Sequence, residues 1–408
     1  MNPVIKGVVM STNATVTGEF SRFFHFLMQE MKPRGPWLTP FNVISIPVIF
    51  TGVVIIVIRF IYGLGAVTNL SQDFPWGFWL GFDVITGVAL AAGAYVITFV
   101  VYVMKVEKYH SIVRITVLNG LLAYIFYAGA LVFDIGRPWQ AYNPYIGNKF
   151  GFSSVMFLIC WHFFLYMVAA FIEFSPVVAE WAGWEKARKF LKSITLATVI
   201  LGITLSILHQ SGLGALFLMA KPKIHPLWWS EFIPVLFLVS SVYAGLAMII
   251  FESTISHRVF RHLIPHDPKH SFDDILFGLA KGAAVVMFVY YFFKALLFIH
   301  GKQWSMINDA WGYWYLVEVI GFVLIPGFMF AFGYRNRSLN IIKIASVMAL
   351  LGIVLNRLNV SVISFKWYAE VHYFPSWQEI VVTLMIIFTE IWILRWVVTR
   401  MPVFKSAH

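Results

Sequence analysis

Five polar side chains that could exchange protons with a bound substrate stand within or at the ends of strongly apolar segments: Asp83, Asp134, Arg137, His209 and Gln210. A charged group surrounded by apolar residues costs several kcal/mol, so each one needs a structural or functional reason. In a helix that rises about 1.5 Å per residue, Asp83 lies roughly 10 Å deeper than Trp76, while the others lie near the same outer edge. We therefore expect the five side chains to share one outer zone.

This set suits the reduction or oxidation of a quinone, which moves two electrons and two protons. Such chemistry needs hydrogen bonds to both carbonyl oxygens, groups that exchange protons, and apolar walls for the ring. We predict that His209 hydrogen-bonds a quinone carbonyl and that Asp83 is a buried proton donor or acceptor. In the alternative interpretation, Asp134, Arg137 and His209 only tie helix ends together, and the Asp134–Arg137 pair favours that structural role.

Further ionisable residues lie at other depths of the apolar segments. They could form a proton path, charge-paired struts between helices, or the coupling sites of a secondary transporter. The proton-path candidates are His162, Glu173, Glu252, Lys281 and Glu318. Lys294, Arg357 and Glu390 belong to the same set, and we favour charge-paired struts for most of its members.

Resident redox metals are not expected. A membrane haem would need two His side chains at matching depth on different helices, and His162 and His209 differ in depth. The single cysteine, Cys160, excludes an intramolecular disulfide, a cysteine-ligated iron–sulfur cluster and a structural zinc site. We therefore predict no haem, cluster or metal in this chain.

The composition places these residues in a membrane. Of the 408 residues, 60% are hydrophobic and 12% are charged, whereas a soluble domain carries about 25% charged residues. Apolar runs of about twenty residues predict transmembrane helices. We predict an all-α integral membrane protein with spans at 41–62, 76–104, 113–134, 152–173, 190–208, 233–256, 275–299, 313–333, 340–363 and 378–398.

An even number of spans puts both termini on one side, and most Lys and Arg residues of the connections fall on that side. The positive-inside rule therefore predicts cytoplasmic termini and explains the net charge of +11 without a nucleic-acid partner. We divide the chain into a cytoplasmic leader (1–40), a ten-helix domain (41–400) and a cytoplasmic tail (401–408). The leader segment Gly18–Met28 could form an amphipathic helix at the membrane surface.

The opposite connections are short and rich in Trp, Pro and His, and Trp79, Trp139 and Trp228 are expected to shape a pocket or a docking surface. Aromatic residues at a membrane interface account for many of them. A rigid platform for an extrinsic subunit is the alternative, and both can hold together.

Several motifs, in order along the chain, resemble those of the NrfD/polysulfide-reductase membrane-subunit family. The branch that they resemble most is the ten-helix quinone-reactive subunit of group 1 nickel–iron hydrogenases (hydrogenase-2 type) and of high-molecular-weight cytochrome complexes. The motifs are Phe74–Asp83, Asp134–Trp139, His209–Gly214, His225–Trp228, Ile250–Glu252 and Tyr373–Trp377. The resemblance spans residues 41–400.

The resemblance implies two four-helix bundles, helices 2–5 and 6–9, flanked by helices 1 and 10. It also implies a quinone site (menaquinone or ubiquinone) in the first bundle near the periplasmic face. Electrons would come from an extrinsic four-cluster ferredoxin-like iron–sulfur subunit, linked to hydrogenase large and small subunits or to a multihaem cytochrome c. Applied to this chain, the resemblance implies that the quinone site is formed by these residues and their neighbours: Trp79, Asp83, Asp134, Arg137, Trp139, His209, Gln210 and His225.

These observations lead to one functional hypothesis with two alternatives. We expect a subunit of a bacterial inner-membrane respiratory complex that exchanges electrons between a periplasmic iron–sulfur protein and the quinone pool. Coupling to proton translocation is an open extension of this hypothesis. The alternatives are an ion- or proton-coupled secondary transporter and a structural membrane anchor without quinone chemistry.

Overall fold

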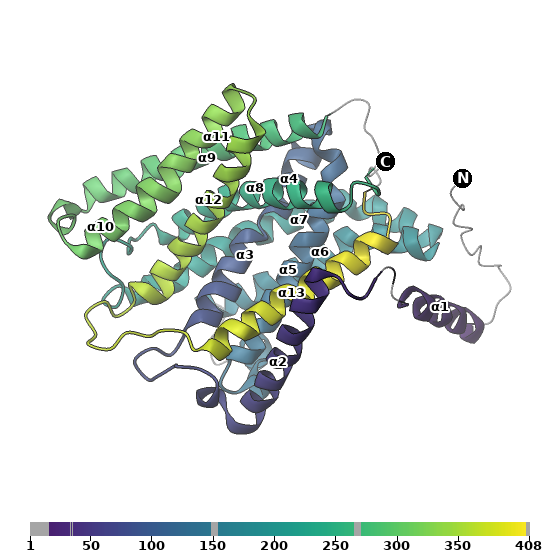
Figure 1. The fold of residues 1–408 in the computed structure, drawn as a ribbon, viewed down its shortest axis with the longest axis horizontal. Helices are drawn as coiled ribbons and strands as arrows, with labels where there is room; N and C mark the ends of the chain where they lie inside the picture. Colours follow the sequence, from purple (N-terminus) through teal and green to yellow (C-terminus); the bar gives the residue numbers. More distant parts are fainter. Residues whose placement is uncertain (1–15, 33, 35, 148–153, 265–270, 405–408) are drawn as a thin grey trace.

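The computed structural model describes residues 16–32, 34, 36–147, 154–264 and 271–404, and its helices lie side by side as long rods (Figure 1). Within these ranges the chain is helical, and an isolated antiparallel bridge between Ile224 and Phe365 is its only β-type pairing. The all-α class is confirmed. The first fifteen residues of the predicted leader and the last four of the predicted tail lie outside the described residues.

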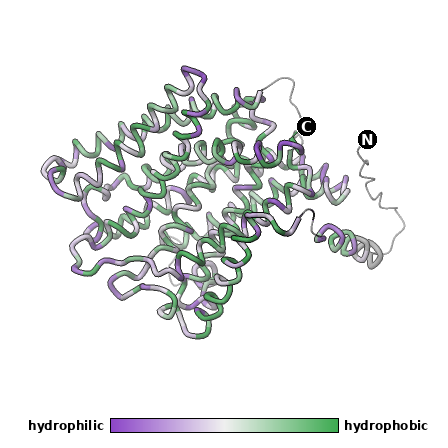
Figure 2. Tube along the Cα trace, viewed as in Figure 1, coloured by the Kyte–Doolittle hydropathy of each residue, from purple (hydrophilic) through white to green (hydrophobic). Residues whose placement is uncertain are grey.

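Ten helices in the described ranges are long and apolar enough to cross a membrane, which confirms the predicted number of spans. Their apolar character follows the rods in Figure 2. The spans are Pro40–Tyr62, Trp79–Val103, Glu107–Asp134, Val155–Ala182, Glu185–Ala220, Ile233–Val259, Phe272–His300, Ala310–Arg335, Leu339–Ile363 and Trp377–Arg400. The fifth span runs well past the predicted end at 208, because His209 and Gln210 are buried inside the helix packing and do not mark its end.

Six spans consist mainly of one helix each: α2 (Pro40–Tyr62), α5 (His110–Asp134), α6 (Val155–Ala182), α8 (Ile233–Val259), α9 (Phe272–His300) and α13 (Trp377–Arg400). The fifth span joins α7 (Glu185–Ala215) to η7 (Leu216–Ala220). The other three are interrupted. The second span contains η2 (Trp79–Thr86), α3 (Gly87–Leu90), α4 (Gly93–Thr98) and η3 (Phe99–Val103). The eighth span contains α10 (Ala310–Leu316), η9 (Val317–Leu324) and α11 (Ile325–Arg335). The ninth span contains α12 (Leu339–Leu358) and η10 (Asn359–Ile363).

A further helix, α1 (Val16–Glu30), covers the segment in which the leader pattern predicts an amphipathic helix. Its Phe23 and Phe26 rings contact Trp184 and Trp181, which lie where α6 leads into α7. We call the side on which α2 begins and α13 ends the terminal side, and the other side the loop side. The placement of α1 at a membrane surface stays a prediction.

The segments η2, η3, η9 and η10 are π-helical, and two of them carry buried acidic side chains. Asp83 lies in η2 and Glu318 in η9, and both side chains are fully buried. In η2 the hydroxyl of Thr86 donates to the carbonyl of Gly81, five residues earlier, at 2.8 Å. Because π-helical turns are rare and concentrate at functional sites, η2 and η9 direct attention to Asp83 and Glu318.

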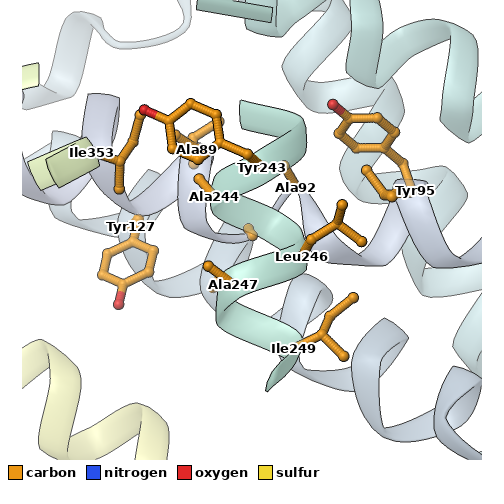
Figure 3. Close-up of a cluster of buried hydrophobic side chains, with 14 of the residues drawn as sticks. Ala89, Ala92, Tyr95, Tyr127, Tyr243, Ala244, Leu246, Ala247, Ile249 and Ile353 are labelled. Atoms are coloured by element: carbon orange, nitrogen blue, oxygen red, sulfur yellow. The ribbon is translucent and has the colours of Figure 1, made fainter. Parts of the chain in front are cut away.

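The second and sixth spans approach each other through small residues. Ala244 and Ala247 of α8 lie beside Ala89 and Ala92 of the second span (Figure 3). A Cβ atom on Gly245 would lie 2.4 Å from the backbone nitrogen of Gly93, closer than real Cβ contacts come. This contact joins the two halves of the chain, whereas their division into two four-helix bundles stays a prediction.

Substitution of Gly245 by Ala is expected to lower the stability of the protein. The backbone of Gly93 cannot move aside as a flexible side chain can. We therefore expect the overpacked variant to lose about 1–3 kcal/mol in free energy of unfolding. Thermal unfolding of the purified protein in detergent measures it. Gly129→Ala on α5 is the matched control, because nothing lies within 4 Å of its added Cβ. An unchanged unfolding temperature in Gly245→Ala would contradict the close approach.

Candidate functional site

Asp83 is a fully buried acid whose hydrogen bonds are incomplete. The side chain has no exposed surface, and its Oδ2 accepts a hydrogen bond from the Thr383 hydroxyl of α13 at 2.9 Å. Its Oδ1 is buried without a hydrogen-bond partner. An unsatisfied buried carboxylate oxygen is costly, and it marks a position that a proton or a ligand donor would complete.

The loop-side end of the second span is fixed by the tenth span and by the loop before it. The indole Nε1 of Trp79 donates to the backbone carbonyl of Glu379 at 3.0 Å, and Trp79 is almost fully buried. The Tyr373 hydroxyl donates to the Glu379 carboxylate and accepts from the backbone N–H of Phe78 at 2.9 Å. Burial, followed by the hydrogen bond to Glu379, raises the pKa of Tyr373, so its hydroxyl keeps its proton.

The sequence interpretation missed Thr383 as the partner of Asp83. A local signal for the start of α13 was present, because Ser376 and Glu379 form a capping box. Glu379, Thr383 and Glu390 follow at intervals of four and seven residues, a spacing that places them on one helix face. The pairing with Asp83, 300 positions away, carries no local signal.

The predicted Asp134–Arg137 pair is wrong as a contact. Arg137 is exposed, and these two described residues form no ion pair. Arg59 of α2 occupies this region instead: it is buried, its Nε donates to the carbonyl of Phe133 at 2.7 Å, and its Nη2 donates to the carbonyl of Ile135. A short, solvated turn lets Arg137 face outward, while Arg59 satisfies carbonyl groups left free at the end of α5. Trp139, 70% exposed, also lies on the loop-side surface.

His209 lies in an aromatic enclosure rather than beside Asp83. Its Nδ1 is 2.8 Å from the carbonyl of Leu205 and therefore carries the proton, and its Nε2 accepts from the Tyr124 hydroxyl. The rings of Tyr124, Phe163 and Tyr166 surround the imidazole. A quinone carbonyl would reach His209 only by replacing one of these hydrogen bonds.

Gln210, the neighbour of His209, serves a contact between spans. Its Nε2 donates to the carbonyl of Val88 in α3 at 2.8 Å, and the side chain is almost fully buried. The fifth span is thereby fixed to the second span close to the π-helical turn that holds Asp83.

His225 and Trp228 lie in the connection between the fifth and sixth spans, on the loop side. The His225 ring stacks on Trp311 with centroids 5.3 Å apart and meets Trp367 edge-on at 4.9 Å. Burial lowers the pKa of His225, so the imidazole is neutral near pH 7. Trp228 donates from Nε1 to Glu318 at 2.7 Å.

The largest cavity described lies nearer the terminal side, and neither Asp83 nor His209 lines it. It has a volume of about 710 Å³ and extends from Pro40 at the start of α2 to Phe260 just beyond α8. Its walls are mostly apolar, but Asn119, Tyr127, Glu252 and Glu390 also line it. The Asn119 amide donates to Glu252 at 2.6 Å.

Two connections lead from this cavity toward Asp83. Tyr127 packs against the backbone of Gly87, where an added Cβ would lie 2.5 Å from the ring, and Gly87 is one helical turn from Asp83. On α13, Glu390 lies about two turns beyond Thr383, the hydrogen-bond partner of Asp83. The cavity and Asp83 therefore share two structural elements, η2–α3 and α13.

The other proton-path candidates do not line this cavity. Glu173 lines a separate cavity of about 230 Å³ with Arg114 and Lys192. Lys281 is exposed, with its ammonium 5.7 Å from the Tyr334 ring centre. Glu318 belongs to a polar cluster of the second half, and His162 is half-buried on α6. Of the five predicted candidates, only Glu252 lines the large cavity.

No cluster of three or more His, Cys, Asp or Glu side chains that could hold a metal ion occurs in the described ranges. The buried carboxyl groups and the Tyr127 phenol described above are chemically able to exchange protons with a bound substrate.

Several known proteins are similar to this chain in sequence over most of its length. The model of the family described as "Polysulphide reductase, NrfD" matches residues 66–365. A Nitratidesulfovibrio vulgaris protein is 39% identical over 389 residues, covering 93% of this chain and 100% of the relative. The probable Ni/Fe-hydrogenase 2 b-type cytochrome subunit of Escherichia coli is 29% identical, and the match covers 85% of this chain and 87% of the relative. The menaquinone reductase integral membrane subunit of N. vulgaris is 25% identical, and the match covers 84% of this chain and 86% of the relative. With ten spans and a family match over most of its length, the chain belongs to the NrfD family of polysulphide reductase membrane proteins.

Proposed function

We propose that this chain is the quinone-reactive membrane subunit of a respiratory oxidoreductase complex. In this role it exchanges electrons between an extrinsic iron–sulfur subunit and the membrane quinone pool. The observation that carries the proposal is the fully buried Asp83, whose Oδ1 lacks a partner inside a π-helical turn. The relatives named as a hydrogenase subunit and as a menaquinone reductase subunit support the same role.

Asp83 would hold the proton that accompanies electron transfer. A quinone takes up two electrons and two protons when it is reduced and releases them when it is oxidised. Protonated Asp83 can donate a hydrogen bond from Oδ1 to a carbonyl oxygen, while Thr383 keeps Oδ2 in place. Trp79, held by the Glu379 carbonyl, fixes the turn that carries the carboxyl group.

The remaining predicted site residues keep narrower proposed roles. Gln210 positions the second span through Val88. His209 stays a proposed quinone ligand that would have to exchange its Tyr124 hydrogen bond. Asp134, Arg137, Trp139 and His225 are proposed to contribute to the quinone site or to the loop-side docking surface, and the exposure of Arg137 and Trp139 favours the docking surface.

Protons are proposed to pass between Asp83 and the terminal side through the large cavity. Glu252 and Glu390 are its carboxyl groups, and Tyr127 and α13 connect it with the surroundings of Asp83. The cavity volume of about 710 Å³ leaves room for several water molecules between these groups. If the termini are cytoplasmic, as the charge distribution predicts, this path would exchange protons with the cytoplasm.

The proposed partners lie on the loop side, which would then face the periplasm of a bacterial inner membrane. They are a four-cluster ferredoxin-like subunit and either hydrogenase large and small subunits or a multihaem cytochrome c. Menaquinone and ubiquinone are both proposed substrates. The chain itself is proposed to hold no haem, which the visible absorption spectrum of the separated subunit tests directly.

Purification of the intact complex from its native membrane tests the function. The proposal expects an iron–sulfur subunit to co-purify and the reduced complex to transfer electrons to a soluble quinone analogue. Proton-coupled solute uptake by vesicles that contain only this chain would instead support the transporter alternative. A complex that lacks quinone reactivity would leave the role of structural anchor.

A further inference from the structure

A third cavity, of about 350 Å³, lies on the loop side of the second half of the chain. It is enclosed by the segment 226–232, the end of α9 and the start of the eighth span. Trp228, Trp229, Phe298 and Tyr315 form aromatic walls, and Lys221, Glu231, Lys294 and Gln303 are among its polar lining residues. None of the groups assigned above to proton transfer lines it.

Lys294 is a buried cation without a hydrogen bond. Its side chain is about 5% exposed, and its Nζ is 3.9 Å from Glu318 Oε1, too far for a hydrogen bond. The Tyr315 ring centre is 5.2 Å away, and the pair with Glu318 is the only ion pair that Nζ forms within the described part of the chain. An ammonium group has three donors, and in apolar surroundings they require acceptors.

Glu318 pairs with Lys294 through its charge and makes its hydrogen bonds to other groups. The carboxylate accepts hydrogen bonds from Trp228 Nε1 and Asn356 Nδ2, both at 2.7 Å, and from the Asn359 amide. Its hydrogen-bonding capacity is thus largely used by neutral donors, although Lys294 still benefits from its charge.

A second buried cation belongs to the same cluster. Arg357 donates to Asn356 Oδ1 and to Ser240 Oγ, both at 2.8 Å, and is almost fully buried. With Lys294 and Arg357 charged, one carboxylate faces two cations in a low-dielectric region. Such an imbalance costs free energy, and a further anion in the cavity would relieve it.

The rim of the cavity matches a lipid headgroup. Lys221 is exposed at the rim, with its ammonium 4.6 Å from the Trp229 ring centre, and is a second cation of the lining that could contact a phosphate. The volume accommodates a phosphate with its glycerol but not acyl chains. Phe232 and Ile299, 45% and 53% exposed, offer an apolar surface beside the cavity along which such chains could lie.

We propose that this cavity binds the phosphodiester headgroup of an anionic phospholipid from the loop-side leaflet, with the phosphate held by Lys294 and Lys221. Glu231 is the acidic residue of the lining and is exposed at the rim. The proposed site is independent of the quinone chemistry assigned to the first half. Its failure would leave that function untouched.

Native mass spectrometry of the purified complex, titrated with phosphatidylglycerol, tests the site. Lys294→Gln is expected to lower the affinity for the most tightly bound phosphatidylglycerol molecule by about 10- to 100-fold, which is the effect of losing a hydrogen bond to a charged group. Lys294→Arg keeps the charge and should retain the lipid. Lys302→Gln removes the same charge from the neighbouring loop without lining the cavity, and should bind as the wild type does.

Thermal unfolding of each variant shows whether the protein remains folded. Equal phosphatidylglycerol affinity in wild type and folded Lys294→Gln would overturn the proposal. Binding of inorganic phosphate at Lys294 without binding of phosphatidylglycerol would also overturn the proposal. A map of the intact complex in which an acidic segment of a partner protein fills the cavity would do the same. If Lys294→Gln does not fold, the Lys294→Arg variant is titrated with phosphatidylglycerol and the wild type with neutral phosphatidylcholine. The proposal expects Lys294→Arg to retain phosphatidylglycerol, and the comparison with phosphatidylcholine shows whether the cavity selects the anionic headgroup.

Discussion

Substitution of Asp83 by Asn is expected to lower quinone turnover of the intact complex by about 100-fold or more, the usual contribution of a positioned acid or base. Asn has nearly the same shape and can still accept the hydrogen bond from Thr383, so assembly should survive. It cannot take up or release a proton. Steady-state reduction or oxidation of a quinone analogue, normalised to the amount of assembled complex, measures the effect.

Asp73→Asn is the matched control for this experiment. Asp73 precedes the same span, but it is mostly exposed and forms its ion pair with Lys366 on the loop side. The same chemical change there should leave turnover within about twofold of wild type, because surface ion pairs contribute little. Wild-type kinetics in an assembled Asp83→Asn complex would remove Asp83 from the proposed mechanism.

Substitution of Glu252 by Gln is expected to slow continuous turnover by at least about tenfold, while the first electron transfer after mixing stays fast. Glu252 lines the cavity through which we propose that protons move, and it is held by the Asn119 amide. Gln keeps the volume but cannot relay a proton. Rapid mixing, with proton uptake followed by a pH dye, separates the first turnover from later ones.

The control for Glu252 is Glu185→Gln, at the start of α7, where the carboxylate is exposed and pairs with Arg188. It should match the wild type in every phase. If Glu252→Gln slows the first and later turnovers equally, Glu252 acts at the quinone itself, and the cavity is then the quinone site. If neither phase changes, the proposed path does not pass through Glu252.

The spans could be predicted because lipid imposes a local rule: about twenty apolar residues must follow one another. This rule places Asp83, Glu252 and Glu318 inside helices without any knowledge of tertiary contacts. It does not reveal that η2 and η9 are π-helical, since the sequence around Asp83 and Glu318 has the same apolar character as an α-helix.

The partners of the predicted site residues were harder to predict, because they come from distant parts of the chain. Asp83 pairs with Thr383, and the end of α5 is held by Arg59 rather than by the nearby Arg137. Proximity in sequence favoured the Asp134–Arg137 pair. In the exposed turn, however, water can solvate the charge of Arg137, so the ion pair is not required. Depth alone likewise grouped His209 with Asp83, although rotation about the helix axis directs His209 toward Tyr124 and Tyr166.

The central claim is that quinone is bound beside Asp83, and a map of the intact complex with a bound quinone or quinone-site inhibitor tests it most directly. We predict head-group density with an oxygen about 3 Å from the carboxyl group of Asp83. Clear head-group density in the cavity lined by Glu252 and Glu390, with none beside Asp83, would contradict the account.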